Sequence, residues 1–373
     1  MQAVRLLTAF HPTRLAPHPD GVYLEFKVAR SLTGTLSTTD KRRPPPVPQN
    51  APTSKEVAES ESKIAVVIPC YRETAHIMSV IESIGDEVSQ IFVIDDACPD
   101  HTGKHVLANC TDGRVKVLTH GQNTGVGGAT LTGYKSAIES GANIIVKLDG
   151  DGQMDPAHIE DLVKPLRQGD ADYAKGNRFF NLDGLSRMPK TRILGNLLLS
   201  FASKVSSGYW NVFDPTNGYT AIRSNVAQHL PFDKLDQGFF FESDMLFRLY
   251  LLRAVVADIP MPANYGNEKS SLKIRNVIFS FTIKHWINTT KRIFYTYFLR
   301  DFGVASIELV LGKIMLLCGM AYGVYGWHGS SVSGVPATAG TVLLAALPVI
   351  LGTQFLIGFI DHDTRNVPTK PLR

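Results

Sequence analysis

Two aspartates separated by one residue, Asp149 and Asp151, form the pattern in this chain with the most direct chemical meaning. The apolar run Ile144 to Leu148 precedes them and Pro156 follows, so the pattern predicts carboxylates between the end of a strand and a helix. Mg²⁺ binds through one or two carboxylates and often takes its other ligands from substrate phosphates. The aspartates therefore predict a divalent-metal site for a phosphorylated substrate.

Two other interpretations of these aspartates remain open. Asp149, Asp151, Gln153 and Glu160 occupy positions one, three, five and twelve of an EF-hand calcium loop. That loop needs glycine at its sixth position, where the chain has Met154, and a preceding helix, where the pattern predicts a strand. A solvated turn is the other alternative, because Asp-Gly pairs are common in turns.

The composition limits the classes of protein to which the chain can belong. It has 373 residues, a formal net charge of +4 and 44% hydrophobic residues, which allows one large domain and membrane segments besides. The charge is too small to indicate nucleic-acid binding, and the four cysteines predict neither a metal site nor disulfides. Residues 1–62 contain proline-rich and Ser/Glu-rich stretches, and we expect a disordered tail and linker without a signal peptide.

Short apolar runs alternate with helical patterns from Ile64 onwards. The runs begin at Ile64, Ile91, Val115 and Ile144. Strands that alternate with helices predict an α/β domain, residues 63–272, with a mainly parallel sheet covered by helices on both faces. Ligands bind beyond the carboxyl ends of the strands in such sheets, where we expect the functional residues.

Candidate binding residues follow the first two runs. Tyr71 offers a ring to cover a nucleobase, and Glu73 can accept hydrogen bonds from a base or a ribose. A carboxylate at a helix N-terminus is an equally good interpretation of Glu73. Asp95 and Asp96 are adjacent carboxylates, whose burial and repulsion must be offset by a ligand, a metal or hydrogen-bond donors. We predict that at least one of them contributes to binding.

A glycine-rich segment, Asn123 to Ala129, leads into the next helical pattern. It lacks the Gly-Lys-Ser/Thr ending of a P-loop, and Thr130 replaces the third glycine of a GxGxxG motif. Its glycines, among them Gly125, allow close packing of the helix against a bound nucleotide or against the sheet. The sequence does not decide between these two.

Basic and acidic residues lie beyond the metal pattern. Arg178 belongs to a strand predicted at 174–179, and Lys190 and Arg192 follow it. Such cations beside a metal site suit a second, anionic substrate, although a solvated helix face is the preferred interpretation of Lys190. Asp214 and the segment Phe239 to Asp244 place carboxylates among aromatic residues, where they can hold sugar hydroxyls or cap a helix.

Seven segments in this order resemble the inverting family 2 glycosyltransferases of the GT-A fold, particularly the branch that acts on polyprenyl phosphates. Together they cover roughly 64–272. The segments are IPCYRE from Ile68, VIDDACPDHT from Val93, NTGVGGA from Asn123, KLDGDGQMDP from Lys147, KGNRF from Lys175, DPTNGY from Asp214 and FESD from Phe241.

This resemblance implies roles for individual residues. It places metal and donor diphosphate on Asp149 and Asp151, with Gln153 as a further metal ligand, and it gives Asp214 a role as base or in orienting the acceptor. It places recognition of the donor nucleotide on Pro69, Tyr71, Glu73 and Asp96. Gly125 of the glycine-rich segment is our further candidate for donor binding. Our candidates for the acceptor phosphate are Arg178, Arg192, Lys269 and Ser270.

The chain departs from this family in one loop. The family has an R-x-x-G-x-S-K-L-like segment where this chain reads Asn264 to Lys273, without the arginine. The resemblance therefore extends only to Lys269, Ser270 and Ser271 there. The chain also lacks the QxxRW signature of processive synthases, which favours a single transfer per acceptor.

The last hundred residues have a membrane pattern. Residues 273–301 interleave basic with aromatic and aliphatic residues, which is typical of an interfacial amphipathic helix. Two apolar segments, near 304–327 and 341–360, are each long enough to span a bilayer, so we expect a transmembrane hairpin over 302–362 and a cytosolic tail over 363–373. Lys and Arg are absent from the connecting loop and present on both outer flanks, which places both termini and the catalytic domain in the cytosol.

The resemblance, together with the membrane pattern, implies a bacterial inner-membrane enzyme that transfers one hexose from a nucleoside diphosphate sugar (UDP- or GDP-linked) to polyprenyl phosphate, with Mg²⁺ or Mn²⁺ as cofactor. The expected partners are these two substrates, the lipid bilayer and a possible second copy of the chain, but no nucleic acid. Transfer to a lipid hydroxyl or a glycan is one alternative. A non-catalytic membrane scaffold or nucleotide-sugar sensor is another.

Overall fold

The computed structural model describes residues 62–180, 190–262 and 274–372, and among these it leaves the side chains of 190–192 and 274–278 undescribed. Lys269 and Ser270 lie outside the described residues, as does the side chain of Arg192. The expected disordered tail lies outside them too, except for Ser62.

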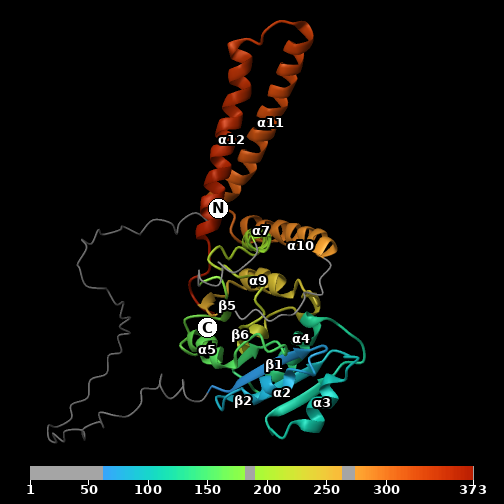
Figure 1. Cartoon of the computed structure of the whole chain (residues 1–373). Coiled ribbons are helices and arrows are strands. Elements are labelled where there is room, and N and C mark those ends of the chain that lie inside the picture. Colours follow the sequence, from blue (N-terminus) through green and yellow to red (C-terminus); the bar gives the residue numbers. More distant parts are fainter. Residues whose placement is uncertain (1–61, 181–189, 263–273, 373) are drawn as a thin grey trace, which may run out of the picture. The chain divides into compact units, whose positions relative to one another are not determined.

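A seven-stranded sheet organises the domain in the order β3-β2-β1-β4-β6-β5-β7 (Figure 1). All neighbouring strands are parallel except those that pair with β6, which is antiparallel to β4 and β5. This confirms the predicted α/β class and mainly parallel sheet. The strands are β1 Ile64–Cys70, β2 Val88–Asp95, β3 Val115–Thr119, β4 Ile144–Lys147, β5 Tyr173–Asn177, β6 Thr220–Arg223 and β7 Val256–Pro260.

Helices cover both faces of this sheet, so the central strands are apolar on both sides. In β1, Ala65 and Val67 belong to the core that includes residues of α4 and α9, whereas Val66 and Ile68 belong to the core that includes residues of α2 and α5. This alternation follows from the two-residue period of a strand. The helices of the domain are α2 Ile77–Glu82, α3 Thr102–Asn109, α4 Val126–Glu139, α5 Ile159–Arg167, α8 Ser224–Ala227 and α9 Phe241–Leu252.

Two further helices, α7 Lys190–Ser207 and α10 Ile274–Phe294, lie side by side and both contact α9 (Figure 1). A π-helical turn, Tyr295–Arg300, continues α10. The long helices α11 Val304–Ser333 and α12 Ala339–Arg365 then form an antiparallel pair. Both are long and apolar enough to cross a membrane, as judged by length and composition.

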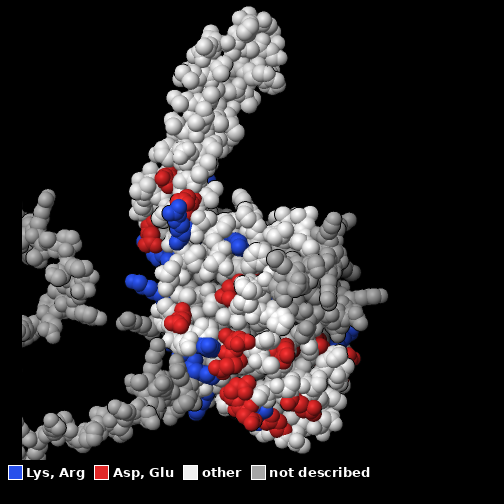
Figure 2. Space-filling model, turned by 60° about the vertical axis from the view of Figure 1, so that its left-hand side comes forward, with Lys and Arg blue, Asp and Glu red and all other residues white. Residues whose placement is uncertain are grey.

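Glycines allow α11 and α12 to pack closely. A Cβ atom added to Gly352 would lie 2.7 Å from the backbone nitrogen of Leu316, and one added to Gly319 would lie 3.0 Å from the carbonyl oxygen of Ala345. Small residues at a helix interface are typical of helix pairs in membranes, where close backbone approach supplies the packing energy. The pair has no Asp, Glu, Lys or Arg over 314–360, and in Figure 2 its charged side chains gather at one end.

The chain after α12 returns to the α/β domain. Near the end of α12, Asp363 receives hydrogen bonds at 2.6 and 3.0 Å from the guanidinium of Arg292 in α10, and at 2.7 Å from the hydroxyl of Tyr297. The backbone nitrogen of Leu372 lies 3.0 Å from both carboxylate oxygens of the buried Asp172. Polar contacts thus fix both the end of α12 and the segment that follows it.

Candidate active site

One cavity of about 1380 Å³ opens beyond the carboxyl ends of β1, β2 and β4. Seven residues predicted from the sequence to bind the donor or a metal line this cavity together. They are Pro69, Tyr71, Glu73, Asp96, Gly125, Asp149 and Asp151. These residues follow different strands of the sequence but meet at one edge of the sheet, as expected for parallel strands.

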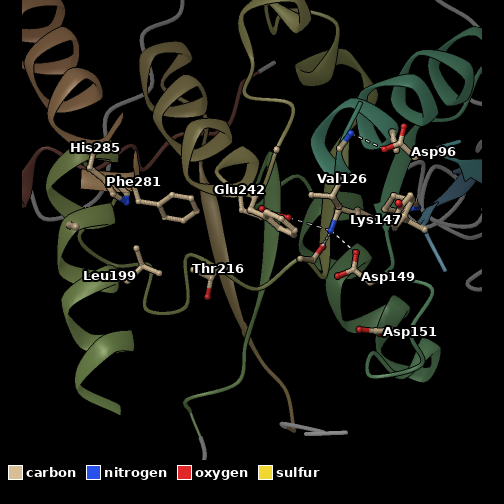
Figure 3. Close-up of a pocket in the computed structure, with 18 of the residues that line it drawn as sticks. Asp96, Val126, Lys147, Asp149, Asp151, Leu199, Thr216, Glu242, Phe281 and His285 are labelled. Atoms are coloured by element: carbon tan, nitrogen blue, oxygen red, sulfur yellow. Dashed lines mark hydrogen bonds and ion pairs between the residues drawn. The ribbon is translucent and has the colours of Figure 1, made fainter. Parts of the chain in front are cut away.

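Asp149 is held in place by a buried lysine that the sequence analysis had not selected. The ammonium of Lys147 lies 2.7 Å from Oδ1 of Asp149 and 3.3 Å from Oε1 of Glu242 (Figure 3). Burial lowers the pKa of Lys147, but the two carboxylates outweigh burial and raise that pKa above its ordinary value. Lys147 therefore remains cationic in the physiological range of pH and compensates both carboxylates.

The glycine of the segment DPTNGY has a steric role beside this lysine. A Cβ atom at Gly218 would lie 2.5 Å from Nζ of Lys147 and 2.7 Å from Oδ2 of Asp149. A side chain at this position would therefore displace one or both of these groups, which contact each other at 2.7 Å. Gly218 therefore allows the loop before β6 to pass close to the aspartate.

The residues around Asp149 suit a cation that takes most of its ligands from a substrate. Asp149 and Asp151 both face the cavity, and Oδ1 of Asp151 accepts a hydrogen bond from the backbone nitrogen of Gln153. The described residues contain no group of three His, Cys, Asp or Glu side chains that would enclose a metal. Two carboxylates without a full protein cage fit Mg²⁺ or Mn²⁺ bound together with phosphates. No calcium-loop helix precedes them, because the chain forms β4 there.

The adjacent carboxylates Asp95 and Asp96 are compensated by donors from the protein. Asp95 accepts hydrogen bonds at 2.7 Å from the backbone nitrogens of Cys98 and Gly103. Burial raises the pKa of Asp96, but hydrogen bonds from Thr124, His120 and Gly125 outweigh it and hold that pKa below its usual range. Asp96 lines the cavity while it also fixes the start of α4, so one carboxylate orders this part of the cavity.

The glycine-rich segment packs against a part of the chain that the sequence analysis did not consider. A Cβ atom at Gly125 would lie 2.6 Å from the carbonyl oxygen of Gln237, and one at Gly127 would lie 2.5 Å from that of Asp236. The loop before α9 therefore requires these glycines. Gly125 also has φ of 88°, which favours glycine, and it lines the cavity.

Arg178 and Asp214 form a bidentate pair. Nε and Nη2 of Arg178 donate to the two carboxylate oxygens of Asp214 at 2.8 and 3.1 Å, and Nη2 lies 3.4 Å from Oγ1 of Thr216. Asp214 is fully buried, whereas the side chain of Arg178 remains 31% exposed. The geometry gives Asp214 the task of orienting Arg178. Neither residue lines the cavity, but Thr216 does.

The opposite part of the cavity is apolar, and sequence reasoning missed it. Leu198, Leu199 and Phe201 of α7 face it, together with Phe281 and His285 of α10 (Figure 3 labels three of them). Burial lowers the pKa of His285 to about 4, so this side chain is neutral at physiological pH. Only the contact between α7 and α10 creates this wall, because the two helices are far apart in the chain.

Residues 65–230 match the family model described as Glycosyl transferase family 2. This range includes strands β1 to β6 except Ile64, the glycine-rich helix start and all four predicted catalytic residues. These residues thus form a glycosyl transferase family 2 domain, and the protein is a glycosyltransferase.

Curated relatives agree with this assignment. A protein from Methanococcus voltae named UDP-N-acetylglucosamine–dolichyl-phosphate N-acetylglucosaminyltransferase is 29% identical over 238 residues, which are 60% of this chain and 94% of the relative. An undecaprenyl-phosphate mannosyltransferase from Micrococcus luteus is 28% identical over 203 residues, which are 53% of this chain and 82% of that protein. The homologues of this chain therefore include transferases that are named for dolichyl and undecaprenyl phosphates.

Among solved structures, glucosyl-3-phosphoglycerate synthase from Mycobacterium tuberculosis in complex with uridine diphosphate superposes with a TM-score of 0.47 at 23% identity. The match covers 64% of this chain and 82% of that chain.

Proposed function

We propose that the protein transfers a single hexose from a nucleoside diphosphate sugar to a polyprenyl phosphate, with a divalent cation, at the cytosolic face of a membrane. The observation that carries this proposal is the composition of the cavity. Its one side presents Asp149 and Asp151, and its other side presents the apolar side chains of α7 and α10. A site with these two sides suits a charged donor and a lipid acceptor that meet between them.

The exposed faces of α7 and α10 support a membrane as the source of the acceptor. Leu194 and Leu197 of α7 are exposed and do not line the cavity, and the same holds for Phe279 and Ile283 of α10. The buried faces of the same helices are polar. They carry Ser200, Ser203, Ser206 and Ser207 in α7, and His285, Asn288 and Arg292 in α10. A helix of a water-soluble protein has the opposite arrangement, so these outer faces fit an apolar environment.

The distribution of charged residues supports the proposed topology of the hairpin. The charged residues of α11 and α12 lie at the end where Asp363 pairs with Arg292 of α10, and the loop between the helices has no Lys or Arg. The positive-inside rule then places that end, and the α/β domain with it, on the cytosolic side.

The chemistry assigns separate tasks to the residues of the site. Asp149 and Asp151 would hold Mg²⁺ or Mn²⁺, which neutralises charge on the leaving diphosphate. A phosphate monoester has a second pKa near ~6 and is largely dianionic at neutral pH, so it needs positioning more than a base. Arg178, oriented by Asp214 and partly exposed, is our candidate for this positioning. Arg192, Lys269 and Ser270 remain proposed further contacts to the acceptor phosphate.

The test is to supply the purified full-length protein in detergent with undecaprenyl phosphate, Mg²⁺ or Mn²⁺ and a panel of UDP- and GDP-sugars. We expect a lipid-monophosphate sugar, detected by mass spectrometry, that is lost on chelation of the metal and in Asp151→Asn. Transfer to a lipid hydroxyl in place of the phosphate, or no lipid product from any donor, would contradict the proposal.

A further inference from the structure

Glu242 occupies a position in the cavity that the proposed reaction has not yet used. It lies in the first turn of α9, and its side chain is 12% exposed and lines the cavity. Figure 3 shows Glu242 and Thr216 between the aspartates on one side and Leu199 and Phe281 on the other. Glu242 thus faces the space between the donor end of the cavity and its apolar end.

Lys147 fixes the distance from Glu242 to the donor end. Its ammonium contacts Asp149 at 2.7 Å and Glu242 at 3.3 Å, so the two carboxylate oxygens that it joins are at most 6.0 Å apart. Lys147 is 1% exposed and emerges from the central strand β4, which leaves it little freedom. A group attached to a diphosphate at Asp149 therefore lies within reach of Glu242.

The charge of Glu242 restricts what it can bind. A carboxylate repels phosphate groups, so it suits neither the donor diphosphate nor the acceptor phosphate, but it accepts hydrogen bonds from hydroxyl groups. Lys147 contacts Oε1, and within the described residues no hydrogen bond to Oε2 is formed. Of the groups that the proposed reaction brings here, the hexose is neutral, the richest in hydroxyls and attached directly to the diphosphate.

We propose that Glu242 accepts a hydrogen bond from a ring hydroxyl of the donor hexose and so determines which hexose the enzyme uses, with Lys147 as the positioning residue that holds the carboxylate. This inference rests on the proposed function. Asp244, two residues along the same helix, does not share this task. Its oxygens interact with Asn288, Arg248 and the backbone nitrogen of Asp236.

This contact can be tested by a thermodynamic cycle in which the residue Glu242 and the hydroxyls of the donor are removed separately and together. Wild type and Glu242→Ala are compared with UDP-glucose, UDP-N-acetylglucosamine and GDP-mannose, and then with analogues of the best donor that lack one ring hydroxyl each. We expect one analogue to lower kcat/KM of the wild type by about tenfold or more, because a buried acceptor loses its partner. Glu242→Ala should show a similar loss with the parent donor and no further loss with that analogue. The matched control is Glu160→Gln, an exposed carboxylate paired with Arg167, which should match the wild type.

Binding measurements separate this inference from the proposed function. Calorimetry with Mg²⁺ should show that Glu242→Ala weakens binding of the nucleotide sugar but leaves binding of the nucleoside diphosphate within about threefold of the wild type. The opposite outcome is that, for every analogue, the loss in kcat/KM of Glu242→Ala equals the product of the losses from the variant alone and from the analogue alone. In that case Glu242 has only a structural or proton-transfer role and the inference is overturned. If the wild type fails to glycosylate polyprenyl phosphate while the binding cycle holds, the acceptor assignment fails and the Glu242 contact stands.

Discussion

Lys175 is buried beside the Arg178–Asp214 pair and donates to the backbone oxygen of Asn217. Burial lowers the pKa of Lys175 to about 8 despite the nearby carboxylates of Glu242 and Asp214. The same sheet thus holds two buried lysines with opposite behaviour. Lys147 contacts two carboxylates and keeps its proton, whereas among the described residues the ammonium of Lys175 donates only to a backbone carbonyl.

This difference predicts how stability depends on pH. The pKa of Lys175 is about 8 in the folded state and about 10.4 in the unfolded chain, so the unfolded state binds more protons between these values. The contribution of Lys175 to stability should therefore rise from pH 8 to pH 10.5, by about 3 kcal/mol at most. The measurement is the free energy of unfolding in detergent for wild type and Lys175→Met at several pH values. Their difference should change over this window, and a constant difference would contradict the prediction. Lys164→Met, at an exposed position, is the control.

The pairing of Asp214 with Arg178 predicts which substrate each variant affects. Arg178→Ala should raise KM for polyprenyl phosphate and lower kcat/KM by about 100-fold, because it removes charge-assisted contacts to a phosphate. Asp214→Asn should have a smaller effect of the same kind, since it loosens the orientation of Arg178. Steady-state kinetics with acceptor varied at saturating donor measures both. A large kcat loss for Asp214→Asn with little effect of Arg178→Ala would instead indicate a general base and a hydroxyl acceptor.

At the scale of elements, a buried ion pair joins α10 to α12. Arg292 and Asp363 are 1% and 5% exposed, and Asp363 also accepts hydrogen bonds from Tyr297 and from Trp210, which follows α7. Arg292 in addition donates to the backbone oxygen of Val205 in α7, a residue of the cavity wall. This network therefore fixes the helices that form the apolar wall relative to the hairpin.

Removal of one partner of the Arg292–Asp363 pair should lower the stability of the protein. Asp363→Asn leaves the Arg292 guanidinium buried without a counter-charge, and we expect a loss of about 3–5 kcal/mol in the free energy of unfolding. Asp361→Asn is a matched control on the same helix, because Asp361 pairs with Arg365 at the surface and should contribute at most about 1 kcal/mol. Chemical denaturation in detergent compares the two. Equal effects would show that the buried pair has no special role.

At the scale of the whole molecule, the outer faces of α7 and α10 should decide access to lipid substrates. Leu197→Glu combined with Phe279→Glu changes two exposed residues that do not line the cavity. We expect activity on undecaprenyl phosphate in vesicles to fall about tenfold or more, because two charges must then leave the interface. Activity on a short-chain acceptor in detergent should persist. Leu107→Glu, at an exposed site on α3, is the control and should have no effect. Equal losses in vesicles and in detergent would indicate damage to the fold.

The topology of the hairpin gives a second prediction at this scale. In a Cys318→Ser background, a cysteine introduced by Val335→Cys between α11 and α12 should react with a membrane-impermeant maleimide in intact cells. A cysteine introduced by Lys164→Cys in α5 should react only after permeabilisation. The reverse result would place the α/β domain outside the cytosol.

The class of sheet, the positions of its first five strands along the chain and the two long apolar helices could all be predicted from the sequence. These features depend on local periodicity and on which residues follow each strand, and both can be read along the chain. The antiparallel strand β6 and the strand β7 were not predicted, because their short segments have weak periodic signals.

Which distant groups meet could be seen only in the folded chain. It paired Lys147 with Glu242, placed Gly125 and Gly127 against the loop before α9, joined Arg178 to Asp214 and created the apolar wall from α7 and α10. Each of these contacts joins segments that are separated by whole strands and helices. Their partners depend on how the sheet closes and how its helices pack, so a pattern of residue types along the chain cannot specify them.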